Sequence, residues 1–80
     1  MHYVYLIQSE KDPTERYVGF TNDLKQRLSD HNAGLSKHTS EHRPWGLVTY
    51  LGFRDAKRAQ NFEKYLKVGS GHAFARRHLW

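Results

Sequence analysis

The sequence predicts a small α+β domain in which three strands form one layer and helices pack against it. Three observations support this fold class: an alternating N-terminal segment rich in aromatic and β-branched side chains, two later segments with apolar residues at helical spacing, and turn residues between them. Eighty residues fit a single domain, expected to span 1–80. A chain of this length buries only about 65% of its unfolded surface, so any functional site has to lie at the rim of a small core.

Two strands are predicted near the N-terminus. Residues 2–8 alternate and are rich in aromatic and β-branched side chains, which is typical of a strand. Residues 9–15 contain Asp-Pro and are predicted as a turn. Residues 16–20 then form a second strand, which we expect to pair antiparallel with the first. In such a hairpin Tyr5 and Tyr17 can come close together.

A first helix is predicted to follow these strands. Thr21 or Asn22 can cap its N-terminus, and it is expected to run to about Asn32 and to end at Gly34. Four of its residues follow the i, i+3, i+4, i+7 spacing of one helical face: Leu24, Arg27, Leu28 and His31. The arginine and the histidine therefore lie on the leucine side of the helix.

The second half of the chain is predicted to contain one strand and two helices. Residues 35–46 are basic and polar and are expected to form a loop, and residues 47–53 a third strand. Asp55 is expected to cap a second helix over 56–68. A Gly-Ser-Gly break then precedes a short final helix over 72–78. The predicted order is β-β-α-β-α-α.

The charge balance favours a polyanionic partner. Thirteen Lys and Arg against eight Asp and Glu give a net charge of +5, and the pI is about 9.8. On so small a surface this indicates nucleic acid, although a basic protein kept soluble by its charge has the same composition. There is no cysteine, no apolar run of roughly 18 residues and no signal-peptide pattern. A cytoplasmic location is therefore the expectation.

Glu63 is the single residue that most needs an explanation. It lies within the apolar stripe of the second predicted helix, which also contains Ala59, Phe62 and Leu66. A carboxylate there must be paired, protonated or bound to a metal. An ion pair with Arg27 or a lysine explains it as well as a functional site does. As a functional group, one carboxylate with water and phosphate oxygens can hold Mg²⁺.

The remaining candidates for chemistry are two tyrosines and the Arg27–His31 pair. Arg27 could stabilise negative charge on a phosphorus centre, and His31 could act as acid or base near neutral pH. Each also has a structural explanation, as a snorkelling arginine and a charge at a helix C-terminus. Tyr5 and Tyr17 can pack across the strands, and a phenol activates water only when its pKa is lowered.

Several basic residues are candidates for contacts with DNA phosphates. They lie in the loop over 35–46 and in the final helix: Lys37, His38, Thr39, His42, Arg43, Arg76 and Arg77. His38 and His42 have the spacing of zinc ligands, but the loop holds no third ligand. Trp45 is expected to pack at the start of the third strand rather than to stack on a base.

These residues together resemble the GIY-YIG nuclease superfamily. Tyr3-Val4-Tyr5 stands where its first triplet would be, with Tyr3 in place of the namesake glycine, and Tyr17-Val18-Gly19 matches the second triplet. Arg27, His31 and Glu63 follow in the family's order. The resemblance covers essentially the whole chain. It is strongest to small stand-alone bacterial members, which are similar to the N-terminal nuclease domain of a bacterial excision-repair protein that acts in DNA repair.

The resemblance implies a three-stranded antiparallel sheet flanked by helices and a one-metal hydrolysis of phosphodiester bonds. By position, Tyr5 would be the general base or water-positioning phenol with Tyr17 as its partner. Arg27 would stabilise the transition state, His31 would assist Tyr5, and Glu63 would hold Mg²⁺ or Mn²⁺. The expected function is a DNA endonuclease acting on single-stranded or structured DNA. The alternatives are a non-catalytic nucleic-acid-binding module and a nuclease subunit active only within a larger repair complex.

Overall fold

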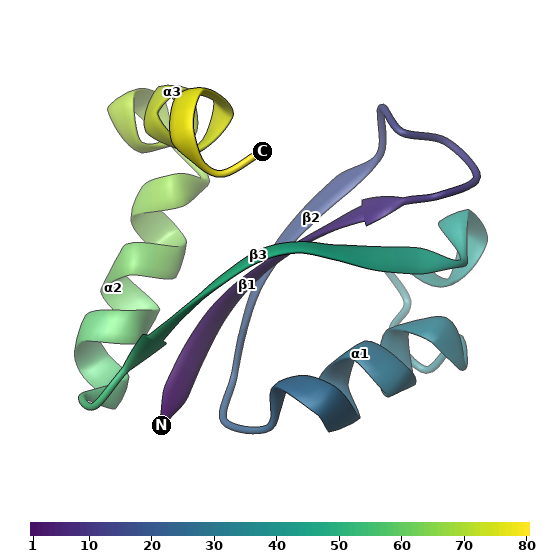
Figure 1. Ribbon diagram of the computed structural model, residues 1–80, viewed down its shortest axis with the longest axis horizontal. Helices are drawn as coiled ribbons and strands as arrows, with labels where there is room; N and C mark the ends of the chain where they lie inside the picture. Colours follow the sequence, from purple (N-terminus) through teal and green to yellow (C-terminus); the bar gives the residue numbers. More distant parts are fainter.

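The computed structural model describes residues 1–80 and contains three strands, three α-helices and one short 3-10 helix (Figure 1). In chain order the elements are β1 (His2–Ser9), β2 (Arg16–Thr21), α1 (Leu24–Asn32), the 3-10 helix η1 (Ser40–His42), β3 (Trp45–Phe53), α2 (Ala56–Leu66) and α3 (Gly69–His78). The predicted α+β class and the predicted order of elements are confirmed. None of the helices is both long and apolar enough to cross a membrane.

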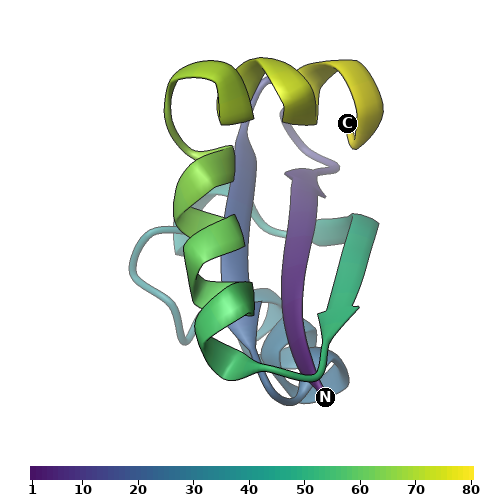
Figure 2. The ribbon, with the colours of Figure 1, turned by 90° about the vertical axis from the view of Figure 1, so that its left-hand side faces the viewer.

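The sheet has the strand order β2-β1-β3, and both pairs are antiparallel. The central strand β1 is the most buried part of the chain, since Val4, Tyr5, Leu6 and Ile7 are each 0–1% exposed. Side chains alternate along a strand, so Val4 and Leu6 face one side of the sheet while Tyr5 and Ile7 face the other. Helix α1 covers the Tyr5 side, whereas α2 and α3 cover the Val4 side (Figures 1 and 2).

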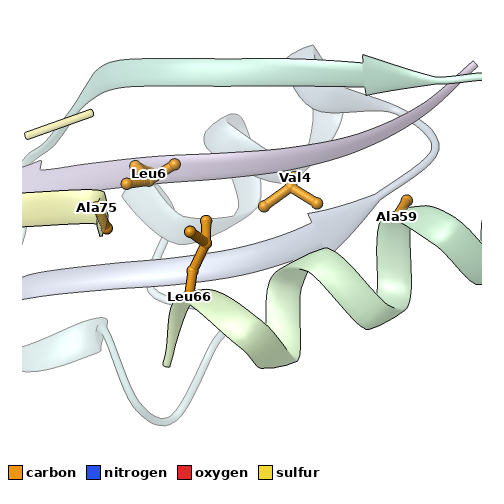
Figure 3. Close-up of a cluster of buried hydrophobic side chains, with 5 residues drawn as sticks. All are labelled: Val4, Leu6, Ala59, Leu66 and Ala75. Carbon is orange, nitrogen blue, oxygen red and sulfur yellow. The ribbon is translucent and has the colours of Figure 1, made fainter. Parts of the chain in front are cut away.

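Each face of the sheet has its own apolar cluster. On the side of α2 and α3 the cluster consists of Val4, Leu6, Ala59, Leu66 and Ala75 (Figure 3). The opposite cluster consists of Tyr5, Ile7 and Trp45, with Tyr17, Leu24 and Leu28 packed against it. The predicted apolar stripe of the second helix is confirmed, because Ala59 and Leu66 are buried and Phe62 packs on the cluster. The predicted packing role of Trp45, which is 4% exposed, is also confirmed.

The N-cap of α1 differs from the prediction. The cap is Asp23, whose carboxylate accepts a hydrogen bond from the backbone N–H of Gln26 at 3.1 Å. Thr21 instead holds the turn before the helix, because its hydroxyl oxygen accepts from the backbone N–H of Asp23 at 3.0 Å. Several residues in a row could act as caps here, and their order along the chain does not say which one leaves the helix geometry first.

The second half of the chain also shows two corrections. Strand β3 begins at Trp45, so it takes two residues from the predicted loop, and α2 ends at Leu66 rather than near 68. The Gly-Ser-Gly segment is the first turn of α3, not a break before it. Gly71 is buried, and a Cβ there would overlap the backbone carbonyl of Tyr65. The glycine therefore permits α3 to pack closely across the end of α2 (Figure 2).

Gly19 allows the closest approach within the sheet. It is paired with Tyr5 across β1 and β2, and a Cβ built at Gly19 would overlap the ring and hydroxyl of Tyr5. The Tyr5 ring is 1% exposed and hydrogen bonded at its far end, so it has little freedom to move aside. The second triplet therefore ends in glycine because the Tyr5 ring occupies the space of a side chain.

We predict that Gly19→Ala lowers the free energy of unfolding by about 1–3 kcal/mol, the usual cost of overpacking a rigid interior. Urea denaturation would measure this loss. The matched control is Gly52→Ala on β3, where the nearest atom to the added Cβ lies 3.4 Å away on the Tyr3 ring and contact is ordinary. Equal stability losses in the two variants would show that the Tyr5 ring is not fixed over Gly19.

Candidate active site

Three aromatic rings from three elements meet on the α1 side of the sheet. Tyr5 comes from β1, Tyr17 from the edge strand β2, and His31 from the last turn of α1. The Tyr5 hydroxyl and His31 Nε2 are hydrogen bonded at 2.7 Å. The ring centroids of Tyr17 and His31 lie 5.3 Å apart, and those of Tyr5 and Tyr17 lie 6.3 Å apart. The predicted proximity of the two tyrosines is therefore observed, with His31 as the third member.

Thr39 completes this cluster from the loop before β3. Its hydroxyl is hydrogen bonded to His31 Nδ1 at 2.7 Å, so both nitrogens of the buried imidazole are paired. The backbone carbonyl of Thr39 accepts the indole N–H of Trp45, also at 2.7 Å. The sequence places Thr39 among the DNA-contacting residues, and this assignment is wrong in the structure, because Thr39 is 0% exposed. The residue orients His31 instead.

A carboxamide fixes the position of this loop relative to α1. Asn32 accepts the backbone N–H of Trp45 at 2.6 Å through its side-chain oxygen and donates to the Trp45 carbonyl at 3.1 Å. The end of α1 and the start of β3 are therefore tied together directly. This connection holds Thr39 in place, although Asn32 itself is exposed and is not distinguished by any sequence pattern.

The pKa values of the cluster follow from its burial. Desolvation raises the pKa of Tyr5 to about 12; the nearby Arg27 guanidinium lowers it in part, while Tyr17 and Glu63 raise it further. Burial also lowers the pKa of His31, assisted by the positive charge of Arg27 and opposed by Asp30. Both members of the Tyr5–His31 hydrogen bond are therefore neutral near pH 7.

An open depression lies beside the cluster, between the end of α1 and strand β2. It is lined by Tyr17, Arg27, Asp30, His31, Leu35 and Ser36. Arg27 is exposed here and Tyr17 is half-buried, so both present groups to a molecule in this depression. Tyr5 and His31 are each 1% exposed and lie beneath them. The predicted placement of Arg27 and His31 on one helical face is confirmed.

Glu63 approaches the same place from α2, on the opposite side of the sheet. Its side chain is 17% exposed and forms an ion pair with Lys67 one turn further along the helix. The Lys67 ammonium in turn lies 5.5 Å from the centroid of the Tyr17 ring. The sequence left open an ion pair with a lysine for Glu63, and the structure contains that pair.

The protein offers a single carboxylate to a metal at this place. No group of three or more His, Cys, Asp or Glu side chains is arranged to hold a metal ion anywhere in the chain, including His38 and His42. Mg²⁺ keeps several waters and is commonly held by one or two carboxylates together with substrate phosphates. The donor set around Glu63 therefore fits Mg²⁺ or Mn²⁺ completed by water and phosphate, and it does not fit a cage made by the protein alone.

The other predicted DNA-contacting residues lie outside this cluster. Those that are exposed are Lys37, His38, Arg43, Arg76 and Arg77, and all of these remain available to a ligand. His42 is half-buried, with its ring 3.6 Å from the Glu15 carboxylate and edge-on to Trp45. Arg43 donates from Nε to the Ser40 carbonyl at 2.8 Å.

Sequence reasoning missed Thr39 as the partner of His31 and Lys67 as the partner of Glu63. The Glu63–Lys67 spacing of four residues on one helix was a usable signal. The Thr39–His31 contact had none, because it joins a loop to a helix through tertiary packing.

Comparison with known proteins places the chain among nuclease domains. The sequence profile of the GIY-YIG catalytic domain matches residues 1–73. A UPF0213 protein of Clostridium perfringens is 35% identical over 68 residues, which cover 84% of this chain and 71% of that protein. The UPF0213 protein YazA of Bacillus subtilis is 33% identical over 67 residues, or 82% of this chain and 66% of YazA. The structure-specific endonuclease subunit SLX1 of Candida dubliniensis is 34% identical over 83 aligned positions, which cover 95% of this chain and 28% of that protein.

We predict that the stability contributed by His31 is lost in acid. The pKa of His31 is lowered in the folded state from an ordinary value of 6.5, so below pH 6.5 the unfolded chain binds a proton that the folded chain resists. The contribution is complete above pH 6.5 and falls as the pH drops towards the folded-state pKa. The difference in unfolding free energy between wild type and His31→Gln, measured by urea denaturation from pH 7.5 to 5, should shrink accordingly. A difference that does not vary with pH would contradict a buried neutral imidazole.

Thr39→Val should lower the free energy of unfolding by about 1–3 kcal/mol, because it leaves a buried ring nitrogen of His31 without a partner. Thr39→Ser keeps the hydroxyl and removes one methyl group, so it should cost only about 1 kcal/mol. Urea denaturation measures both, and ¹⁵N chemical shifts of the His31 ring report the tautomer. The hydrogen-bond role is excluded if valine is tolerated as well as serine and the ring shifts do not change.

Proposed function

The chain belongs to the GIY-YIG nuclease superfamily, and from this premise we propose that it is a metal-dependent endonuclease that hydrolyses phosphodiester bonds in DNA. One observation carries the proposal. Side chains from β1, β2, α1 and α2 converge at one edge of the sheet, where Arg27, Tyr17 and Glu63 all affect the pKa of the Tyr5 phenol. A proton acceptor, a cation and a carboxylate at one place are the groups that attack on a phosphodiester requires.

Tyr5 and His31 form the proton-accepting pair in this proposal. With a pKa of about 12, Tyr5 does not supply a phenolate at neutral pH. The phenol instead accepts a proton from the attacking water as it passes its own proton to His31 Nε2. This requires the neutral imidazole with its proton on Nδ1, donated to the Thr39 hydroxyl. The lowered pKa of His31 keeps the ring neutral and ready to accept.

Arg27 and Tyr17 act at the surface of the depression. Arg27 is exposed there and carries a charge that does not titrate near neutral pH, so it stabilises the extra negative charge of a pentacovalent phosphorus. Tyr17 is half-buried beside it and positions the attacking water against the phosphate. The water then passes its proton inward to Tyr5, whose ring lies next to that of Tyr17.

Glu63 would hold the divalent cation, with water and phosphate oxygens as the remaining ligands. When bound, Mg²⁺ or Mn²⁺ supplies Lewis-acid stabilisation of phosphate and leaving-group oxygens. The Glu63 carboxylate would have to exchange the ammonium of Lys67 for this cation. Lys67 is 43% exposed in its side chain, so it is free to turn towards solvent or a phosphate.

For the substrate we propose single-stranded or structured DNA. The net charge of +5 supports a polyanion, and the relative from Candida dubliniensis is named a structure-specific endonuclease subunit. The word subunit also favours one alternative, a nuclease that is active only within a larger repair complex. A non-catalytic binding module is the other alternative.

We predict that the purified chain cleaves fluorescent single-stranded or branched oligonucleotides with Mg²⁺ or Mn²⁺ and not with EDTA. Tyr5→Phe should reduce kcat/KM by about 10²–10⁴-fold, the usual contribution of acid–base catalysis. Glu63→Gln should remove the metal-dependent activity. The matched control is Tyr50→Phe, which removes a hydroxyl from a side chain that is 53% exposed on β3.

A second readout makes the metal assignment independent of activity. Mn²⁺ should broaden NMR signals of residues around Glu63 in wild type and not in Glu63→Gln. Cleavage by Tyr5→Phe and Glu63→Gln at the wild-type rate would disprove the mechanism. Binding of DNA without metal-dependent cutting would favour the binding module, and activity restored by a copurifying partner would favour a nuclease that works only within a complex.

A further inference from the structure

A second depression lies on the other side of Tyr17 from the candidate active site. It is lined by Arg16, Tyr17, Val18, Leu66, Lys67, His72, Arg76 and Trp80, and we call it the β2–α3 groove. Tyr17 lines both this groove and the depression that contains Arg27, so the two are continuous at that side chain. The other residues come from β2, the end of α2, α3 and the C-terminus.

The fold leaves this groove accessible. β2 is an edge strand, paired only with β1, and α3 lies across the end of the sheet near the end of α2 (Figure 2). Arg16, Lys67, His72 and Arg76 are exposed, whereas Leu66 is buried beneath them. The groove therefore has an apolar and aromatic floor and a cationic rim.

The cations of the rim are poorly neutralised. None of the residues lining the groove is acidic, and neither Arg16 nor Arg76 has a carboxylate within ion-pair distance. Arg16 is held by other means: its guanidinium lies 5.0 Å from the centroid of the Trp80 ring and donates to the Gln8 side chain at 3.3 Å. Only Lys67 has an acidic partner, which is Glu63.

We propose that the β2–α3 groove binds the phosphodiester backbone of a single-stranded DNA segment adjoining the scissile phosphate. The inference rests on the proposed function and assigns the path of the substrate strand. Cations along a groove neutralise successive phosphates, while aromatic rings such as Tyr17 and Trp80 offer surfaces on which unpaired bases stack. A duplex would keep its bases stacked internally and could not use those rings. Continuity through Tyr17 leads the bound strand to Arg27.

The test separates binding from catalysis. Binding of a fluorescent oligothymidine is measured by anisotropy in EDTA, as a function of salt, for wild type, Arg16→Gln/Arg76→Gln and a matched control. The control Lys25→Gln/Lys57→Gln removes the same charge from exposed residues on α1 and α2 outside the groove. Lys67 is left unchanged because it pairs with Glu63. Arg76→Gln alone and thermal melting guard against misfolding caused by the loss of the Arg16–Trp80 contact.

The groove variant should bind with a salt slope smaller by about 1.4 and an affinity about 25-fold lower at 0.1 M salt, since each cation contributes a slope of about 0.7 on single strands. Arg76→Gln alone should show about half of the slope change. The control should stay within about twofold of wild type, because distant charges are screened at this salt concentration. Duplex DNA of equal length should bind more weakly than oligothymidine.

Equal losses in the groove and control variants, or tighter binding of duplex, would overturn the groove assignment while metal-dependent cleavage by wild type would leave the endonuclease intact. Groove-dependent binding without cleavage by wild type would support the groove and refute the endonuclease. Failure of wild type to bind or cut any DNA would refute both.

Discussion

The packing of the Tyr5 ring over Gly19 is the contact on which the rest of the site depends. Because the ring occupies the space of a side chain on β2, its hydroxyl reaches His31 on α1. His31 then pairs with Thr39, and the Thr39 carbonyl accepts the indole N–H of Trp45. One line of contacts thus joins all three strands to α1. Each link is buried, so removing one partner leaves a polar group without water or protein to replace it.

Burial also decides which groups carry charge. The same desolvation raises the pKa of Tyr5 and lowers that of His31, so both become neutral and can share a hydrogen bond without a buried ion. The charged members, Arg27, Glu63 and Lys67, lie closer to the surface. An 80-residue chain with a small core could not bury these charges without a large desolvation cost. The site is therefore a neutral pair in the interior surrounded by charges at the rim.

The sequence was sufficient to predict the fold class, the order of the elements and the shared face of Arg27 and His31. Those features depend on alternation and helical spacing, which are local properties of the chain. The position of Thr39 could not be predicted in this way, since its environment is set by tertiary contacts between a loop, α1 and β3. The Gly-Ser-Gly segment was misinterpreted for the same reason: its glycines serve close packing against Tyr65, which no local pattern reveals.

The location of the site at an edge strand explains how so few residues can assemble it. α1 and α2 lie on opposite faces of the sheet, yet Arg27 and Glu63 both act on Tyr5. Around a central strand, the neighbouring strands would extend the barrier between the two faces by about 4.8 Å on each side. Around β2 the barrier ends at Tyr17, and side chains from both helices can meet there. A strand of nucleic acid that follows the β2–α3 groove therefore crosses the edge of the sheet, where both helices can contact the same phosphate.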